Sequence, residues 1–94
     1  LVVTGEFGRT RLNANSGRDH WPSITPMLLS GGAYSHGRVI GKADKAYVPT
    51  ENKIGPIDVA ATLFDHFGIP KETQRIDQGG RPRYLLEGDG KVIL

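Results

Sequence analysis

The sequence contains no cysteine, which excludes disulfide bonds and thiolate metal sites. A bound metal ion would therefore need imidazole nitrogens and carboxylate or backbone oxygens as ligands. No apolar run approaches the roughly 20 residues of a membrane-spanning helix. Basic residues outnumber acidic ones only by 12 to 10, and no run of them forms a phosphate-binding stripe. Neither nucleic-acid binding nor a membrane span is therefore expected.

Regular structure is also expected to be sparse. Thirteen glycines and six prolines stand among 94 residues, which predicts many turns and a thin core. Most domains run to roughly 100–150 residues, and this chain opens inside an apolar stretch with no initiator methionine. We therefore expect residues 1–94 to be one fragment of a larger domain.

Two short apolar runs, residues 1–4 and 27–29, are predicted to be buried strands, because each is bounded by glycine. Residues 8–21 form a long polar stretch without helical or alternating period, which predicts either a functional loop or a disordered one. Two hairpins are expected. The first would join residues 38–41 to 45–48, and the second would join residues 84–86 to 91–94.

The clearest helix is predicted over residues 56–67. Pro56 suits the first helical position, and Asp58 places a negative charge in the first turn. Gly68 and Pro70 give the stop signal. Spacing predicts one apolar face, formed by Ile57, Ala60, Ala61, Leu63, Phe64 and Phe67.

Candidate ligands follow the first predicted strand. Glu6 lies at the end of that strand, where α/β proteins commonly bind ligands. Asp19 and His20 stand together farther along the polar stretch. Carboxylate oxygens and imidazole nitrogens suit divalent cations, so these three residues are predicted metal ligands. Their spacing forms no compact local motif, so folding would have to assemble the site.

Arg9 and Arg18 are predicted to bind an anion, because guanidinium groups offer paired donors to phosphate or sulfate. The alternative is that they form ion pairs with Glu6 and Asp19. Trp21 is expected to anchor the core or a loop rather than to stack on a ligand. No serine, threonine or cysteine has the setting of an activated nucleophile, so no catalytic residue is predicted.

Four blocks of the sequence resemble, in this order, the C-terminal part of a bacterial sulfatase-like family catalogued as domain of unknown function 1501. That family is abundant in planctomycetes and belongs to the alkaline phosphatase-like superfamily. The likeness covers nearly the whole chain. The blocks are Thr-Gly-Glu-Phe-Gly-Arg-Thr at residues 4–10, Gly-Arg-Asp-His-Trp-Pro at 17–22, Leu-Leu-Ser-Gly-Gly at 28–32 and Asp-Val-Ala-Ala-Thr-Leu at 58–63.

The resemblance implies an α/β fold. The chain would be a C-terminal fragment of an alkaline phosphatase-like α/β sandwich, with few short strands, one clear helix (about residues 56–67) and long loops. Glu6 would replace the metal-binding aspartate of the sulfatase pattern Thr-x-Asp-His-Gly, and Phe7 would replace its histidine, so one ligand is lost. His20 resembles the late metal-ligand histidine, with Asp19 beside it. The superfamily's nucleophile would lie upstream of Leu1.

The activity implied is the metal-dependent hydrolysis of sulfate or phosphate esters, with a divalent ion as cofactor and a small-molecule or polysaccharide ester as substrate. The fragment by itself is expected to be inactive. The resemblance also implies an extracytoplasmic or secreted protein. The alternative is a non-catalytic binding or structural module of the same fold, which is favoured by Phe7 in a ligand position.

Overall fold

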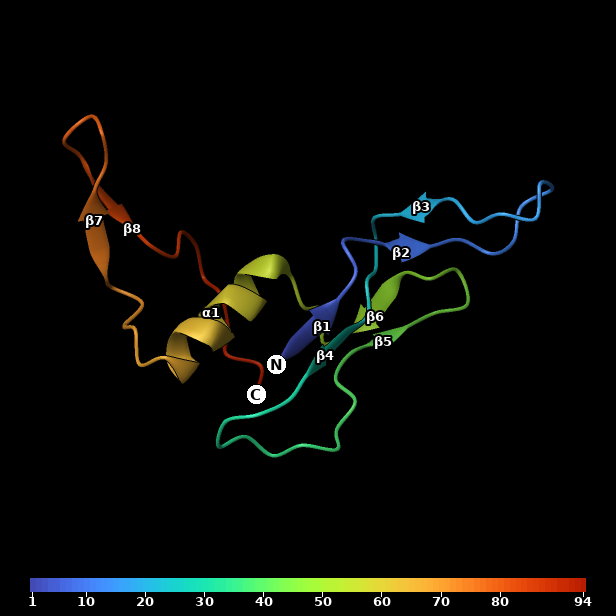
Figure 1. Cartoon of the computed structure of the whole chain (residues 1–94), viewed down its shortest axis with the longest axis horizontal. Helices are drawn as coiled ribbons and strands as arrows, with labels where there is room; N and C mark the ends of the chain where they lie inside the picture. The colour runs from blue at the N-terminus through green and yellow to red at the C-terminus, as the bar shows by residue number, and fades with distance from the viewer. The chain divides into compact units, whose positions relative to one another are not determined.

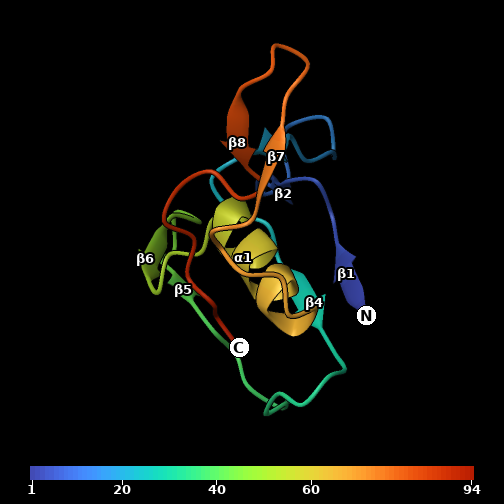
Figure 2. The same cartoon turned by 90° about the vertical axis from the view of Figure 1, so that its left-hand side faces the viewer.

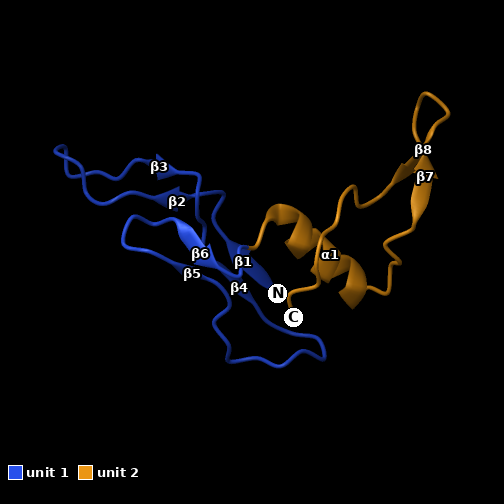
Figure 3. Ribbon diagram, turned by 180° about the vertical axis from the view of Figure 1, so that it is seen from behind, with its two compact units in different colours: residues 1–53 blue, residues 54–94 orange.

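The computed structural model describes residues 1–94 and divides them into two compact units, Leu1–Lys53 and Ile54–Leu94 (Figure 3). Short strands and one helix of 11 residues give the mixed character expected of the α/β class. Each strand pairs with one other strand, so every sheet is a two-stranded antiparallel ribbon. No helix of this structure has the length and apolarity needed to cross a membrane.

The first ribbon pairs β1 (Val2–Thr4) with β4 (Met27–Leu29), as the apolar runs predict. Val3 lies opposite Leu28. The prediction that these strands are buried is wrong, because Val3 and Leu28 are each 55% exposed. Apolar composition reports what a strand can bury, whereas burial requires a second layer, and a two-stranded ribbon supplies none by itself.

The second ribbon lies within the stretch predicted to be a loop. β2 (Gly8–Arg9) pairs with β3 (His20–Trp21), and the turn between them is organised by Asn13. The Asn13 side-chain oxygen accepts hydrogen bonds from the Asn15 and Gly17 N–H groups at 3.1 and 3.0 Å. Two-residue strands are too short to show an alternating pattern, so hydrophobic periodicity cannot predict them.

The third ribbon pairs β5 (Lys42–Ala43) with β6 (Pro49–Glu51). A hairpin was expected here, but the predicted strands at residues 38–41 and 45–48 are wrong. The Asp44 carboxylate accepts hydrogen bonds from the Ala46 and Val48 N–H groups at 2.8 and 3.0 Å. Residues 44–48 form this turn, so the second strand begins at Pro49, directly after the segment predicted to form it.

Helix α1 (Pro56–His66) confirms the predicted helix, with Gly55 at the N-cap and Gly68 at φ 66° just beyond the C-terminus. Its buried face agrees with the prediction at Ala61 but differs at Thr62, which was not predicted to be buried, and at Phe67. Ala61 and Thr62 are buried at 2% and 3% exposure, whereas Phe67 is 70% exposed. The buried face is the one that meets the last residues of the chain.

The last residues lie along α1 and do not form the predicted terminal hairpin (Figure 2). β7 (Gln74–Ile76) pairs instead with β8 (Pro82–Tyr84). The C-terminal segment, residues 88–93, is held by side chains. Asp58 Oδ1 accepts from the Lys91 N–H at 2.8 Å, and Thr62 Oγ1 accepts from the Ile93 N–H at 3.1 Å. The predicted strand was therefore wrong because helix side chains take the place of a partner strand.

Asp58 also makes this packing sensitive to acid. Its pKa lies below the ordinary value of 3.8, because the Gly55 N–H and then the Lys91 N–H donate to the carboxylate. A lowered pKa means that the charged group stabilises the folded chain above pH 3.8 and that this stabilisation disappears as the pH falls below it. We expect the hydrogen-exchange protection of the Lys91 amide, corrected for intrinsic exchange, to drop in that window.

The matching variant is Asp58→Asn, which keeps an acceptor oxygen but cannot titrate. Its Lys91 protection is expected to be lower at neutral pH and to show no acid step. Asp77 has a lowered pKa as well, so a global unfolding measurement would mix the two groups, whereas the Lys91 amide reports on Asp58. An identical pH profile in both proteins would contradict the assignment.

Candidate functional site

The β2–β3 ribbon brings together two blocks that are separated along the sequence. Gly8 lies opposite Trp21 and Arg9 opposite His20, so residues 4–10 and 17–22 run side by side (Figure 1). The Thr10 N–H donates to the Asp19 carbonyl at 3.0 Å and extends the pairing by one residue. Of the predicted site residues, Arg9 and His20 are therefore paired within the ribbon, while Glu6 precedes β2 and Arg18 and Asp19 precede β3.

One face of the ribbon carries an aromatic contact. The rings of Phe7 and His20 lie with their centroids 3.9 Å apart and their planes inclined by 35°. The Arg9 guanidinium carbon is 5.5 Å from the Phe7 ring centroid, within the range of a cation–π contact. Phe7 thus contacts both members of the opposed pair Arg9 and His20.

Asp19 lies one residue before β3 and bonds to the turn of the ribbon. Its N–H donates to Thr10 Oγ1 at 2.9 Å, and its carboxylate accepts from the Asn13 amide at 3.3 Å. These bonds tie Asp19 to the turn of the ribbon. The part of Asp19 in a metal site stays a prediction.

The three predicted metal ligands are all exposed, and they do not form a cluster. Glu6 lies in the short connection between β1 and β2, one residue before Phe7. Its carboxylate makes no hydrogen bond or ion pair, and the same holds for the ring nitrogens of His20. Glu6 and His20 therefore offer free oxygen and nitrogen donors of the kind that divalent cations accept. The metal site stays a prediction.

The two predicted anion-binding arginines donate to backbone carbonyls. Arg9 Nη1 lies 3.5 Å from the Arg18 carbonyl oxygen, and Arg18 Nη1 lies 2.7 Å from the Thr10 carbonyl oxygen. The alternative, ion pairs with Glu6 and Asp19, is wrong for this structure. Each guanidinium keeps further donors, because it carries five N–H groups and both side chains are exposed. Anion binding stays a prediction.

Trp21 fixes the ribbon to its neighbour within the first unit. Its indole N–H donates to the Tyr47 carbonyl oxygen at 2.8 Å. Arg11 reinforces this contact, since its guanidinium donates to the Lys45 carbonyl at 3.3 Å and lies 5.9 Å from the Tyr47 ring. The prediction of Trp21 as a loop anchor is confirmed.

The sequence was compared with models of known protein families. A family model described as "Protein of unknown function (DUF1501)" matches residues 1–94. The chain belongs to the DUF1501 family. A search of curated proteins and a search of solved structures returned no match.

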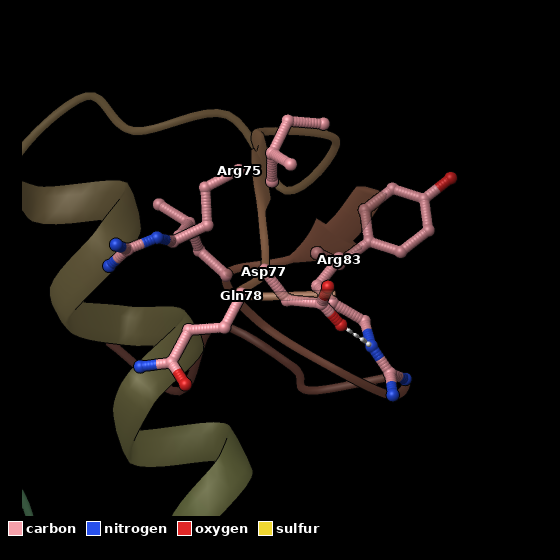
Figure 4. Close-up of a pocket in the computed structure, with 7 residues that line it drawn as sticks. Arg75, Asp77, Gln78 and Arg83 are labelled. Atoms are coloured by element: carbon pink, nitrogen blue, oxygen red, sulfur yellow. Dashed lines mark hydrogen bonds and ion pairs between the residues drawn. The ribbon is translucent and has the colours of Figure 1, made fainter. Parts of the chain in front are cut away.

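The DUF1501 chain has a second feature, a shallow open hollow of about 490 Å³ beside the β7–β8 ribbon (Figure 4). It is lined by Arg75, Ile76, Asp77, Gln78, Arg83, Tyr84 and Leu85. In Figure 4 the labelled Asp77 reaches Arg83, while Arg75 takes no part in that pair. The lining combines charged, polar and apolar side chains, and it contains none of the predicted site residues.

Asp77 serves the turn of this ribbon. Its carboxylate accepts from the Arg81 N–H at 2.9 Å and the Gly79 N–H at 2.8 Å, and Arg83 Nε lies 3.4 Å away. These bonds, the Arg81 N–H foremost, hold its pKa below the ordinary value. No strand is predicted from the sequence at residues 74–76. An aspartate two residues before a pair of glycines is a turn signal that could have revealed this hairpin.

Proposed function

We propose that the DUF1501 chain is the C-terminal part of a metal-dependent hydrolase of sulfate or phosphate esters, built on an alkaline phosphatase-like α/β sandwich and exported from the cytoplasm. The observation that carries the proposal is the register of the β2–β3 ribbon. It places Phe7, the residue that follows Glu6, against His20, and neither the Glu6 carboxylate nor the His20 imidazole makes a hydrogen bond.

Each residue has a distinct part in this proposal. Glu6 and His20 would contribute an oxygen and a nitrogen ligand to a divalent ion, and further ligands and the nucleophile would come from elsewhere in the gene product. When bound, that ion would polarise the ester and stabilise developing charge. Arg9 and Arg18 present spare guanidinium donors for the anionic end of the substrate. Asp19 bonds to Asn13 and Thr10 and so holds the turn that spaces β2 and β3.

The test uses the complete gene product. Zn²⁺ and Mn²⁺ are titrated calorimetrically, and turnover is followed with a chromogenic aryl sulfate and an aryl phosphate. Glu6→Ala and His20→Ala are each expected to weaken metal affinity by roughly tenfold or more, since even residues that only support metal ligands contribute 10- to 100-fold. Metal-dependent turnover should fall with the affinity.

His36→Ala is the matched control, because His36 is exposed in a loop outside the ribbon. It should leave affinity unchanged. Asp19→Ala separates two versions of the site. If Asp19 is a ligand, its removal should cost as much as that of His20; if it holds the turn, the cost should be smaller. Unchanged affinity in folded His20→Ala protein would overturn the proposal.

The second candidate is a non-catalytic binding or structural module. Two observations favour it: the Phe7 ring lies against His20, and no three acidic or histidine side chains cluster to hold an ion. On this view the complete protein would turn over neither ester, and Glu6→Ala and His20→Ala would leave metal binding and folding as they are.

A further inference from the structure

We propose that Phe7 is a positioning residue for His20: its ring fixes the orientation in which the imidazole meets a metal ion. This inference rests on the proposed function. It starts from the 3.9 Å separation of the two ring centroids across the β2–β3 ribbon.

A histidine in this position needs something to orient it. His20 is exposed and lies in a strand of two residues, and its ring nitrogens make no hydrogen bond. Metal-binding histidines are usually oriented by a hydrogen bond from the ring nitrogen that does not face the metal. His20 has no such bond. The face of the Phe7 ring is the contact that restricts its rotation.

Phe7 is itself held in place. The Arg9 guanidinium carbon lies 5.5 Å from its ring centroid. Directly after Phe7, Gly8 is buried so close to the Ile24 backbone that a Cβ would not fit, which restricts the main chain between Phe7 and Arg9. The Phe7 ring is therefore restricted by its backbone and by the Arg9 guanidinium. A ring held in this way can restrict the rotation of the His20 imidazole that packs against it.

The experiment compares Phe7→Ala, Phe7→Leu and Phe7→Tyr with His20→Ala in the complete gene product. Zn²⁺ affinity is measured by calorimetry, and the His20 ring protons are followed by NMR. Phe7→Ala and Phe7→Leu are expected to weaken Zn²⁺ binding by about tenfold, the lower end of the range for residues that orient a ligand. Their His20 ring-proton shifts should move toward free-histidine values. Phe7→Tyr, which keeps the aromatic ring, should retain both the Zn²⁺ affinity and the His20 ring-proton shifts of the unmodified protein.

Phe67→Ala is the matched control, because Phe67 also lies beside a histidine ring, that of His66, but outside the ribbon. It should change neither readout. If His20→Ala leaves Zn²⁺ binding intact, the proposed function fails. If His20→Ala abolishes binding while Phe7→Leu binds as tightly as Phe7→Tyr, only the positioning role is overturned. The Leu and Tyr pair decides the question even if Phe7→Ala does not fold.

Discussion

Gly8→Ala is expected to destabilise the first unit by about 3 kcal/mol, the upper part of the usual range for forcing extra atoms into a packed site. Gly8 is buried, and a Cβ placed there would overlap the Ile24 carbonyl oxygen and lie 3.2 Å from Ile24 Cγ2. The obstacle is backbone, so it cannot swing away as the end of a flexible side chain would. β2 would have to move, and its pairing with β3 would weaken.

Trp21 allows this loss to be measured. It is the single tryptophan and its indole N–H is bonded to the Tyr47 carbonyl, so its fluorescence reports on the unit that contains Gly8. The urea midpoint followed by that fluorescence should fall sharply in Gly8→Ala. Gly5→Ala is the control, because its Cβ would meet nothing closer than 3.6 Å. Equal midpoints for the two variants would contradict the packing argument.

Local composition was sufficient to predict the first ribbon and the helix, but not the other strands. The apolar runs at residues 2–4 and 27–29 form strands, and the signals around Pro56 and Gly68 bound the helix to within a residue. Burial was not predictable in this way. Exposure of Val3 depends on what packs over the ribbon, and no local pattern contains that information.

The hairpin positions were predicted wrongly for a related reason. An aspartate side chain decides where each turn lies: Asp44 accepts from Ala46 and Val48, and Asp77 accepts from Gly79 and Arg81. The Asp44 turn takes up residues 44–48, so β6 begins at Pro49 instead of Lys45. A polar side chain that hydrogen-bonds to nearby backbone groups competes with strand pairing. The pattern of hydrophobic residues contains no sign of such a bond.

The candidate site was predictable as a pair of blocks but not as a geometry. Glu6, Arg9, Asp19 and His20 were identified from residue type, and the structure places their blocks on one ribbon. Which face each side chain takes depends on the register of that ribbon, and a shift of one residue reverses every face. The contact between Phe7 and His20 follows from this register, so it could not be foreseen.

Gly90→Ala is expected to detach the C-terminal segment (residues 88–93) from α1. Gly90 is buried, and a Cβ there would lie 2.5 Å from the Ile57 carbonyl oxygen and 3.0 Å from Ala61 Cβ. The helix backbone and the buried Ala61 methyl group cannot move aside, so the C-terminal segment must move away from α1. Its hydrogen bonds from the Lys91 N–H to Asp58 and from the Ile93 N–H to Thr62 would then break.

The cost should be about 3 kcal/mol, because forced overpacking costs 1–3 kcal/mol and the lifted contacts add to it. In hydrogen exchange this corresponds to a loss of roughly a hundredfold in protection at the Lys91 and Ile93 amides, since each 1.4 kcal/mol is a factor of ten. Asp89→Ala, which changes the exposed neighbouring residue, should leave both amides protected. Full protection in Gly90→Ala would show that helix and segment are not packed through Gly90. The Lys91 amide also reports the acid effect at Asp58, so the two experiments test the same contact independently.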